Sequence, residues 1–215
     1  MAYFPFLTDI NGMRCLVVGG GRIAVQKVKI LLDFGVNIRV VAEEIGEELR
    51  GLQKQAASGE KGCLTEIWER GFEKEDIFGM DFVIAATDHE ELNHTVSKLC
   101  RECRIPVNAV DKKEDCDFIF PALIRKGDVV ISVSTGGNSP AAAAFLKERL
   151  MGHIPEYYGG MVERLGEYRE EIKEHVADAK KRKELFYRLL SYGEMHDGEI
   201  PELVMRKLLE EYVKE

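Results

Sequence analysis

Residues 14–35 have the sequence RCLVVGGGRIAVQKVKILLDFG, which combines three structural signals in one short stretch. The run Cys15–Val18 is short, apolar and rich in β-branched residues, which predicts a buried strand. Gly19–Ala24 follows at once and fits the spacing G-x-G-x-x-A. Apolar residues then recur at helical spacing up to Gly35, which predicts a helix that ends there. Glycines between a strand and a helix are the context that a dinucleotide-binding fingerprint requires.

Each small residue of this fingerprint has a physical role. Gly19 permits the tight turn, Gly21 lets the backbone approach a pyrophosphate closely, and Ala24 allows the helix to pack against the strand. The N–H groups at the start of the helix would then face the phosphates. We therefore predict a dinucleotide site at this turn. The alternative is a glycine-rich turn between a strand and a helix that binds nothing.

An acidic pair follows the second predicted strand, Asn37–Ala42. Glu43 lies about 20 residues beyond the glycines, where an acid accepts hydrogen bonds from the adenosine ribose hydroxyls and repels a 2′-phosphate. This position favours NAD over NADP as the cofactor. Alternatively, Glu43 or Glu44 only stabilises the N-terminus of the next predicted helix, residues 44–57.

The alternation of strands and helices continues along the first half of the chain. The pattern predicts a strand over 63–68, a strand over 82–87, a helix over 90–103 and a strand over 106–110. Asp88 can cap that helix. Thr87 and Asp88 also follow a strand directly, at the carboxyl edge where open α/β sheets bind their ligands. We predict an α/β fold with a Rossmann-like, doubly wound parallel sheet.

Asp111 comes directly after the last of these strands. The carboxyl ends of parallel strands lie at one edge of the sheet, so Asp111 is expected beside the nicotinamide end of the dinucleotide. A carboxylate there can take a proton while hydride leaves to NAD. Asp111 is therefore our candidate catalytic base. The alternative is a loop aspartate that caps a turn.

The pattern changes after Lys112. Apolar runs at 116–124 and 129–134 flank a Lys-Gly-Asp turn and predict two antiparallel strands. The next turn, Thr135–Pro140, then opens a helix, with Ser139 as its cap and proline at its first position. The N–H groups and hydroxyls of this turn suit an anion such as a carboxylate, and an ordinary capped turn explains them equally well. Beyond residue 155 the chain is predicted to be helical and highly charged.

Composition excludes several classes of protein. A net charge of −8 over 215 residues argues against a nucleic-acid-binding protein. No apolar run approaches the roughly 18 residues of a membrane helix, and we expect no signal peptide. The five cysteines are odd in number and scattered, as expected of reduced thiols in a cytoplasmic protein. Cys100 and Cys103 share a predicted helix without a second cysteine pair, so we predict no metal site.

Several motifs occur in an order that is typical of one family. They are Tyr3–Leu7, Val17–Gly21 with Ala24 and Lys27, Val40–Ala42, Ala85–Asp88 with Leu92 and Asn93, Pro106–Asn108, Val110–Asp111, Cys116–Ala122 and Ser134–Pro140. Over residues 3–150 the chain resembles the precorrin-2 dehydrogenase family, which includes the N-terminal module of siroheme synthase. Cys116–Ala122 and Ser134–Pro140 carry this resemblance most specifically.

The resemblance implies oxidation of precorrin-2 to sirohydrochlorin with NAD, on the route to siroheme. It also implies that Asp111 is the catalytic aspartate, and that the chain forms a homodimer through its central segment. We accordingly divide the chain into an NAD-binding domain over 1–113, a dimerisation and substrate segment over 114–152 and a helical domain over 153–215.

The candidate site residues follow from these arguments together. The candidate cofactor contacts are Gly19, Gly21, Arg22, Ile23, Ala42, Glu43, Glu44, Thr87, Asp88 and Asn108. The candidate substrate contacts are Phe120, Pro121, Arg125, Ser134, Thr135, Gly136, Gly137, Asn138 and Ser139.

The implied substrate is a carboxylate-rich tetrapyrrole, so a chain of net charge −8 needs local cations to bind it. Candidates are Lys112, Lys113, Arg125 and Lys126. Some family members also insert iron into sirohydrochlorin, and this activity is left open here. Two other functions fit the same residues: a non-enzymatic NAD-binding redox sensor, and an NAD-dependent dehydrogenase of another anionic substrate.

Overall fold

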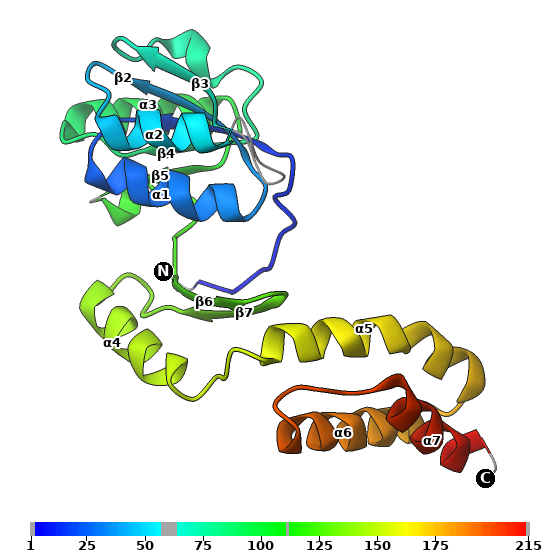
Figure 1. Ribbon diagram of the computed structural model, residues 1–215. Helices are drawn as coiled ribbons and strands as arrows, with labels where there is room; N and C mark the ends of the chain where they lie inside the picture. Colours follow the sequence, from blue (N-terminus) through cyan, green and yellow to red (C-terminus); the bar gives the residue numbers. More distant parts are fainter. Residues whose placement is uncertain (1–2, 57–63, 111, 214–215) are drawn as a thin grey trace. The chain divides into compact units, whose positions relative to one another are not determined.

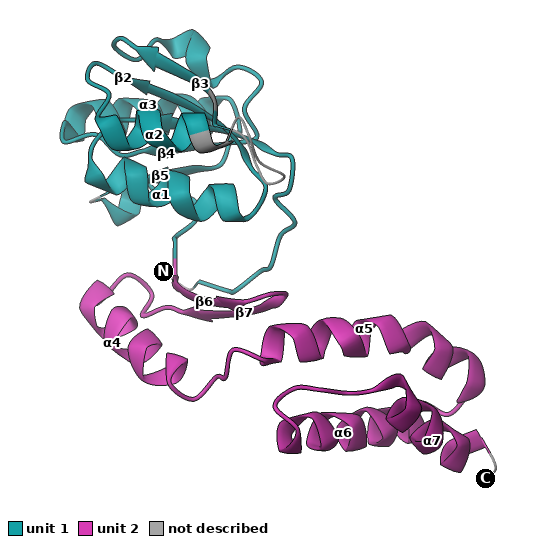
Figure 2. Cartoon of the chain, viewed as in Figure 1, with its two compact units in different colours: residues 1–120 teal, residues 121–215 magenta. Residues whose placement is uncertain are grey.

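The chain forms two compact units, Met1–Phe120 and Pro121–Glu215 (Figure 2). They are seen in a computed structural model that describes residues 3–56, 64–110 and 112–213. The division into 1–113, 114–152 and 153–215 is finer than these two units and stays a prediction.

A parallel five-stranded sheet with the order β3-β2-β1-β4-β5 forms the centre of the first unit (Figure 1). Its strands are β1 (Arg14–Val18), β2 (Asn37–Ala42), β3 (Leu64–Glu69), β4 (Phe82–Ala85) and β5 (Val107–Ala109). The strand order reverses between β1 and β4, and open α/β sheets bind their ligands outside the carboxyl ends of the strands at this reversal. The predicted Rossmann-like parallel sheet is confirmed.

Helices cover both faces of this sheet, which explains why the central strands β1 and β4 are apolar on both sides. They are α1 (Arg22–Asp33), α2 (Glu47–Ala56) and α3 (Glu90–Glu102), with short 3₁₀ helices η1 (Lys74–Ile77) and η2 (Lys113–Asp115). Cys15 and Val17 pack into the same core cluster as α1, whereas Leu16 and Val18 pack into the cluster of α3. The two-residue period of β1 therefore holds a helix on each face.

The second unit begins with an antiparallel hairpin and continues as helices. Its elements are β6 (Ala122–Lys126), β7 (Val129–Val133), α4 (Pro140–Met151), α5 (Tyr158–His175), α6 (Ala179–Met195) and α7 (Glu202–Val213). The last three helices pack around the fully buried side chains of Ile172, Leu185, Leu189 and Met205. Among the described residues, no helix has the length and apolar character needed to cross a membrane.

The predicted first strand of the hairpin, residues 116–124, is wrong in its first half, because the strand begins only at Ala122. Residues before it bond to β5 instead. The N–H of Asp117 donates to the carbonyl of Val107 at 2.8 Å, and the side-chain amide of Asn108 donates to the carbonyl of Phe118 at 2.8 Å. Pro121 has no N–H to donate to a ladder. The apolar run is therefore shared between the two units.

Candidate functional site

The fingerprint turn follows β1 and touches the ends of two neighbouring strands. The N–H of Gly19 donates to the carbonyl of Val41 at 2.8 Å. Gly19 has a φ of +120°, and a Cβ atom there would lie 2.4 Å from the carbonyl oxygen of Ala86, which follows β4. Both the conformation and this close approach exclude a side chain. The turn is therefore held where the strand order reverses.

The start of α1 is open toward solvent. Gly21 is its N-cap residue, has extended backbone geometry and offers no side-chain cap, and the first turn contains no acidic residue. A Cβ atom on Gly21 would meet nothing within 4 Å. Arg22 and Ile23 are exposed beside it. This cradle fits the diphosphate of a dinucleotide, because the first N–H groups of a helix and its dipole attract anions.

The predicted acidic pair lies against the same turn. A Cβ atom on Gly20 would lie 2.2 Å from the backbone oxygen of Glu44 and 3.1 Å from Cβ of Ala42. Glu43 and Glu44 are both exposed, and Ala42 is buried at the end of β2. The structure thus places the backbone of Glu44 against the fingerprint turn, whereas the Glu43 carboxylate lies 3.6 Å from the place of a Cβ atom on Gly71. Exposed carboxylates at this place can accept hydrogen bonds from ribose hydroxyls.

Thr87 and Asp88 also lie at this edge, where the structure contradicts one prediction, the capping of α3 by Asp88. The Thr87 hydroxyl donates to Oδ1 of buried Asn93 at 2.8 Å, and the Asn93 amide donates to the Thr87 carbonyl at 2.9 Å. The predicted capping of α3 by Asp88 is wrong, since the N-cap residue is His89 and makes no side-chain cap bond. Asn93 closes the loop before the helix instead. The Asp88 side chain is 93% exposed, so its carboxylate faces solvent.

Asp111, the candidate base, lies outside the described residues, while the residues on both sides of it are firmly bonded. The N–H of Val110 donates to the carbonyl of Ala85 at 2.9 Å. The ammonium of Lys112 pairs with Glu90 at 2.8 Å. Buried Asn108 donates from its side-chain amide to the Phe118 carbonyl, which holds the segment after η2.

One face of α3 holds the segment 112–117. Four residues of this helix, spaced by three or four, contact it: Glu90, His94, Ser97 and Arg101. His94 Nδ1 lies 2.9 Å from the buried carboxylate of Asp115, and the Ser97 hydroxyl donates to the Asp115 carbonyl at 2.8 Å. Arg101 donates to the Glu114 carbonyl at 2.7 Å and to the Asp117 carboxylate at 2.9 Å. The sequence reasoning did not find this arrangement, although the helical spacing of four polar residues was a signal.

The structure adds Lys27 to the residues at this edge. Lys27 lies on α1, and its Nζ atom is 3.8 Å from the centre of the Phe120 ring. Burial lowers the pKa of Lys27 to about 8. Phe120 itself packs against the core cluster of α1. Lys27 belongs to the motifs that carry the family resemblance, but the sequence does not show that its ammonium lies beside Phe120.

In the second unit, the predicted anion-binding turn is shaped by its own hydroxyls. Thr135 Oγ1 donates to the Ser139 carbonyl at 2.9 Å, and Ser134 Oγ accepts from the N–H of Gly136 at 3.1 Å. Ser139 caps α4 by accepting from the N–H of Ala142 at 3.1 Å. The predicted capping and the first-turn proline are confirmed. Gly136 and Gly137 have positive φ values, and Gly137 and Asn138 are exposed.

The four candidate cations have different surroundings. Lys112 is paired with Glu90, and Lys126 is paired with Glu156 within the second unit. Arg125 is exposed and donates to the carbonyl of Gly127 at 3.2 Å. Pro121, which precedes β6, is half-buried. The Nζ atom of Lys113 lies 5.4 Å from the centre of the Tyr3 ring. Lys112 and Lys126 thus already have acidic partners.

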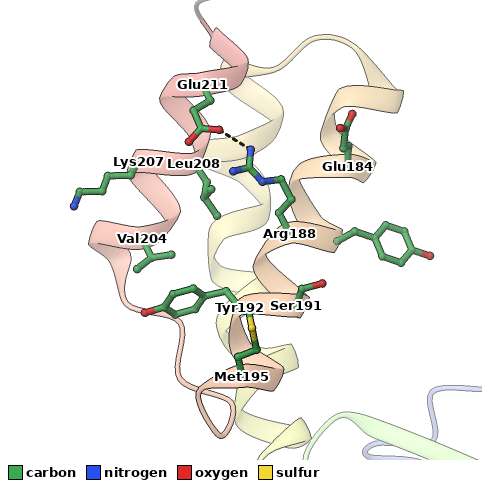
Figure 3. Close-up of a pocket in the computed structure, with 10 residues that line it drawn as sticks. Glu184, Arg188, Ser191, Tyr192, Met195, Val204, Lys207, Leu208 and Glu211 are labelled. Carbon is green, nitrogen blue, oxygen red and sulfur yellow. Dashed lines mark hydrogen bonds and ion pairs between the residues drawn. The ribbon is translucent and has the colours of Figure 1, made fainter.

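A groove of about 620 Å³ lies between α6 and α7 (Figure 3). Arg188 and Glu211 form an ion pair at 2.6 Å across it, and Tyr192, Met195 and Leu208 line its apolar part. None of the predicted site residues lies there. We assign no reaction to this groove, because its lining lacks an activated nucleophile with a neighbouring base.

Comparison with known proteins identifies relatives along the whole chain. The model of a family described as "Putative NAD(P)-binding" matches residues 6–122. A siroheme synthase from Thioalkalivibrio sulfidiphilus is 38% identical over 205 residues, which cover 95% of this chain and 39% of that protein. A siroheme synthase from Pseudomonas aeruginosa is 35% identical over 220 residues, which cover 99% of this chain and 44% of that protein. This chain therefore spans less than half the length of these relatives.

A solved structure named "SirC, precorrin-2 dehydrogenase" shares the fold. It superposes with a TM-score of 0.71 at 23% sequence identity, covering 99% of this chain and 100% of that chain. The correspondence includes the hairpin and the helices that follow it, and not only the dinucleotide-binding sheet.

Proposed function

The chain belongs to the NAD(P)-binding family, and on this premise we propose that it oxidises precorrin-2 to sirohydrochlorin with NAD in siroheme biosynthesis. One observation carries the proposal: relatives named siroheme synthase align with 95% and 99% of this chain. A chain that shared only dinucleotide binding with them would align over the first unit alone. The shared fold with SirC, a precorrin-2 dehydrogenase by name, is consistent with the same reaction.

The residues around the fingerprint turn would hold the cofactor. The start of α1 at Gly21 would bind the diphosphate, and Glu43 or Glu44 would accept hydrogen bonds from the ribose. A carboxylate at this place repels a 2′-phosphate, so we propose NAD rather than NADP. Bound NAD would supply the hydride acceptor. The remaining chemistry belongs to the side chains of the protein.

Oxidation of the substrate removes a hydride and a proton, so a base must take the proton. We assign this role to Asp111. Its neighbours in the chain bond to the first unit: Val110 to the carbonyl of Ala85, and Lys112 to Glu90 on α3. The proposed contacts for substrate carboxylates are Arg125 and the turn Ser134–Ser139. Arg125 is exposed, and so are Gly137 and Asn138 in the turn.

The experiment that tests this function is anaerobic incubation of the protein with precorrin-2 and NAD, followed by visible absorption. We expect the spectrum of sirohydrochlorin to appear. Adding ferrous iron afterwards, with an iron-only control, tests the chelatase activity. Bound NAD without any spectral change would contradict the proposal and favour a redox sensor or a different anionic substrate.

Replacing the base should separate binding from turnover. Asp111→Asn removes the proton acceptor, and general base catalysis typically contributes about 10²–10⁴-fold to the rate. We therefore expect kcat to fall by about that factor while the Kd for NAD stays unchanged. The matched control is Glu91→Gln, which removes an exposed carboxylate in the first turn of α3 and should retain most of the turnover. Normal kcat in Asp111→Asn would remove this residue as the base.

We also propose that the protein is a homodimer and acts in the cytoplasm. The helix α4, which lies in the predicted dimerisation segment 114–152, exposes four large apolar side chains: Phe145, Leu146, Leu150 and Met151. Such a patch on a soluble protein is typical of an interface.

The cysteines Cys15, Cys100, Cys103 and Cys116 are free thiols, which suits a reducing compartment.

A further inference from the structure

Lys27 is a cation that the fold partly buries without giving it an acidic partner. Its side chain is half-buried, and among the described residues no carboxylate lies within 4.0 Å of its ammonium. Lys29, on the same helix, differs from it because it pairs with Glu48 at 2.5 Å on the exposed face. Burying an ammonium without a partner is unfavourable, so an unpaired and partly buried lysine is a candidate for function.

The groups around Lys27 do not neutralise it. The ring of Phe120 lies 3.8 Å from the ammonium and offers a cation–π contact. The Cys116 sulfur is the titratable group that the described structure places in electrostatic contact with Lys27. Burial raises the pKa of the Cys116 thiol, so this group is neutral near pH 7 and is no counterion. Neither neighbour is an anion near pH 7, so the ammonium has no counterion among the described residues.

This place lies at the functional edge of the sheet. The Cys116 thiol donates to the carbonyl of Ala109 at 2.9 Å, and Ala109 is the last residue of β5. Lys27 is thus close to the carboxyl end of β5, where open α/β sheets bind their ligands. Phe120 adds an apolar surface next to the cation. An apolar face beside one positive charge suits the edge of a macrocycle that carries a carboxylate side chain.

We propose that Lys27 is a substrate-binding residue that pairs with one carboxylate of the tetrapyrrole. This inference rests on the proposed function and names a recognition contact within it. The ammonium is already partly removed from water in the free protein, which reduces the desolvation cost when the carboxylate arrives. The chain carries a net charge of −8, and Lys112 and Lys126 already pair with acidic residues. A lysine without an acidic partner at this edge would therefore attract a substrate carboxylate without first breaking an ion pair.

The test compares Lys27→Met, Lys27→Arg and the control Lys29→Met. The Kd for sirohydrochlorin is followed by its visible absorption, and the KM for precorrin-2 and the Kd for NAD are measured on the same preparations. A hydrogen bond to a charged group is strong, so Lys27→Met should raise the Kd and KM of the tetrapyrroles by about tenfold or more. Lys27→Arg should retain most of the affinity, and Lys29→Met should match the wild type.

A pH series gives a second readout. Burial lowers the pKa of Lys27 to about 8, so its charge in the free protein is present below pH 8 and is lost as the pH rises through it. The wild-type affinity for sirohydrochlorin should therefore fall between pH 7 and pH 9. Lys27→Arg keeps its charge over this range and should show a weaker fall.

Three results would overturn the inference. If the wild type binds and oxidises the tetrapyrroles but Lys27→Met has the same Kd and KM, the contact is absent while the proposed function stands. If Lys27→Met weakens NAD binding instead, the lysine serves the dinucleotide. If the wild type neither binds sirohydrochlorin nor oxidises precorrin-2, the proposed function fails and the inference fails with it.

Discussion

Two neighbouring glycines of the fingerprint turn, Gly20 and Gly21, differ in the space around them. A Cβ atom on Gly20 would lie 2.2 Å from the backbone oxygen of Glu44, whereas one on Gly21 would meet nothing within 4 Å. Backbone cannot move aside as a flexible side chain can, so the first position excludes any larger residue. The second position is free within the protein and open toward the proposed ligand.

This difference predicts opposite effects for two alanine substitutions. Gly20→Ala should destabilise the protein by about 1–3 kcal/mol, the usual cost of overpacking. Gly21→Ala should change the stability by less than about 1 kcal/mol. It should nevertheless weaken NAD binding, because its methyl group occupies the path of the diphosphate. Thermal unfolding and the Kd for NAD measured on both variants check this.

The two variants act as controls for each other. If Gly21→Ala binds NAD as tightly as the wild type, the open start of α1 does not hold the diphosphate. A Gly20→Ala variant with wild-type stability would show that the contact with Glu44 relaxes at no cost.

At the scale of elements, α3 covers one face of the sheet and also binds the segment 112–117. Its inner side packs into the core through Val96 and Cys100. A second stripe on the same helix, formed by Glu90, His94, Ser97 and Arg101, bonds to the segment 112–117. The helix therefore joins the core of the sheet to the segment that follows the proposed base.

Loosening this stripe should slow the reaction more than it weakens binding. Arg101→Ala removes the hydrogen bonds to Glu114 and Asp117, and a misplaced catalytic group can cost up to about 10²-fold in rate. We expect kcat to fall by about tenfold, with an unchanged Kd for NAD. The control is Lys98→Ala, which removes an exposed side chain on the same helix. Equal kcat in both variants would show that the stripe does not affect catalysis.

At the scale of the whole molecule, the exposed apolar surface of α4 requires an explanation. Phe145 is 54% exposed and Leu146 is 45% exposed. Both lie in the segment that the family resemblance assigns to a dimer interface. Contact with a second copy of the chain would remove this surface from water, at about 25 cal/mol per Å² of apolar area buried.

A charged residue on α4 should therefore separate the dimer. Phe145→Glu places a carboxylate in the proposed interface, and we expect the variant to be monomeric by light scattering while the wild type is dimeric. Met195→Glu is the control, because Met195 is 74% exposed on α6, outside the proposed interface. A monomeric wild type, or a dimeric Phe145→Glu variant, would contradict the proposed interface.

The local signals in the chain were sufficient for most of the fold. The strand–glycine–helix pattern at 14–35 and the Ser139–Pro140 helix start both have the predicted form. Each of these features depends on residues close together in the chain, so periodicity and turn chemistry report them directly. The family resemblance added the reaction and the proposed base, Asp111.

Only the tertiary structure decided the contacts between distant segments. Residues 116–118 bond to β5 and not to a hairpin partner, and Asn93, six residues away, engages Thr87 where Asp88 was expected to cap α3. The surroundings of the Lys27 ammonium are formed by Phe120 and Cys116, which lie about 90 residues further along the chain. A periodic pattern shows which face of a helix or strand a residue occupies. It does not show which distant residue packs against that face, because several packing partners fit the same hydrophobic pattern. The folded structure alone determines which of these partners makes the contact.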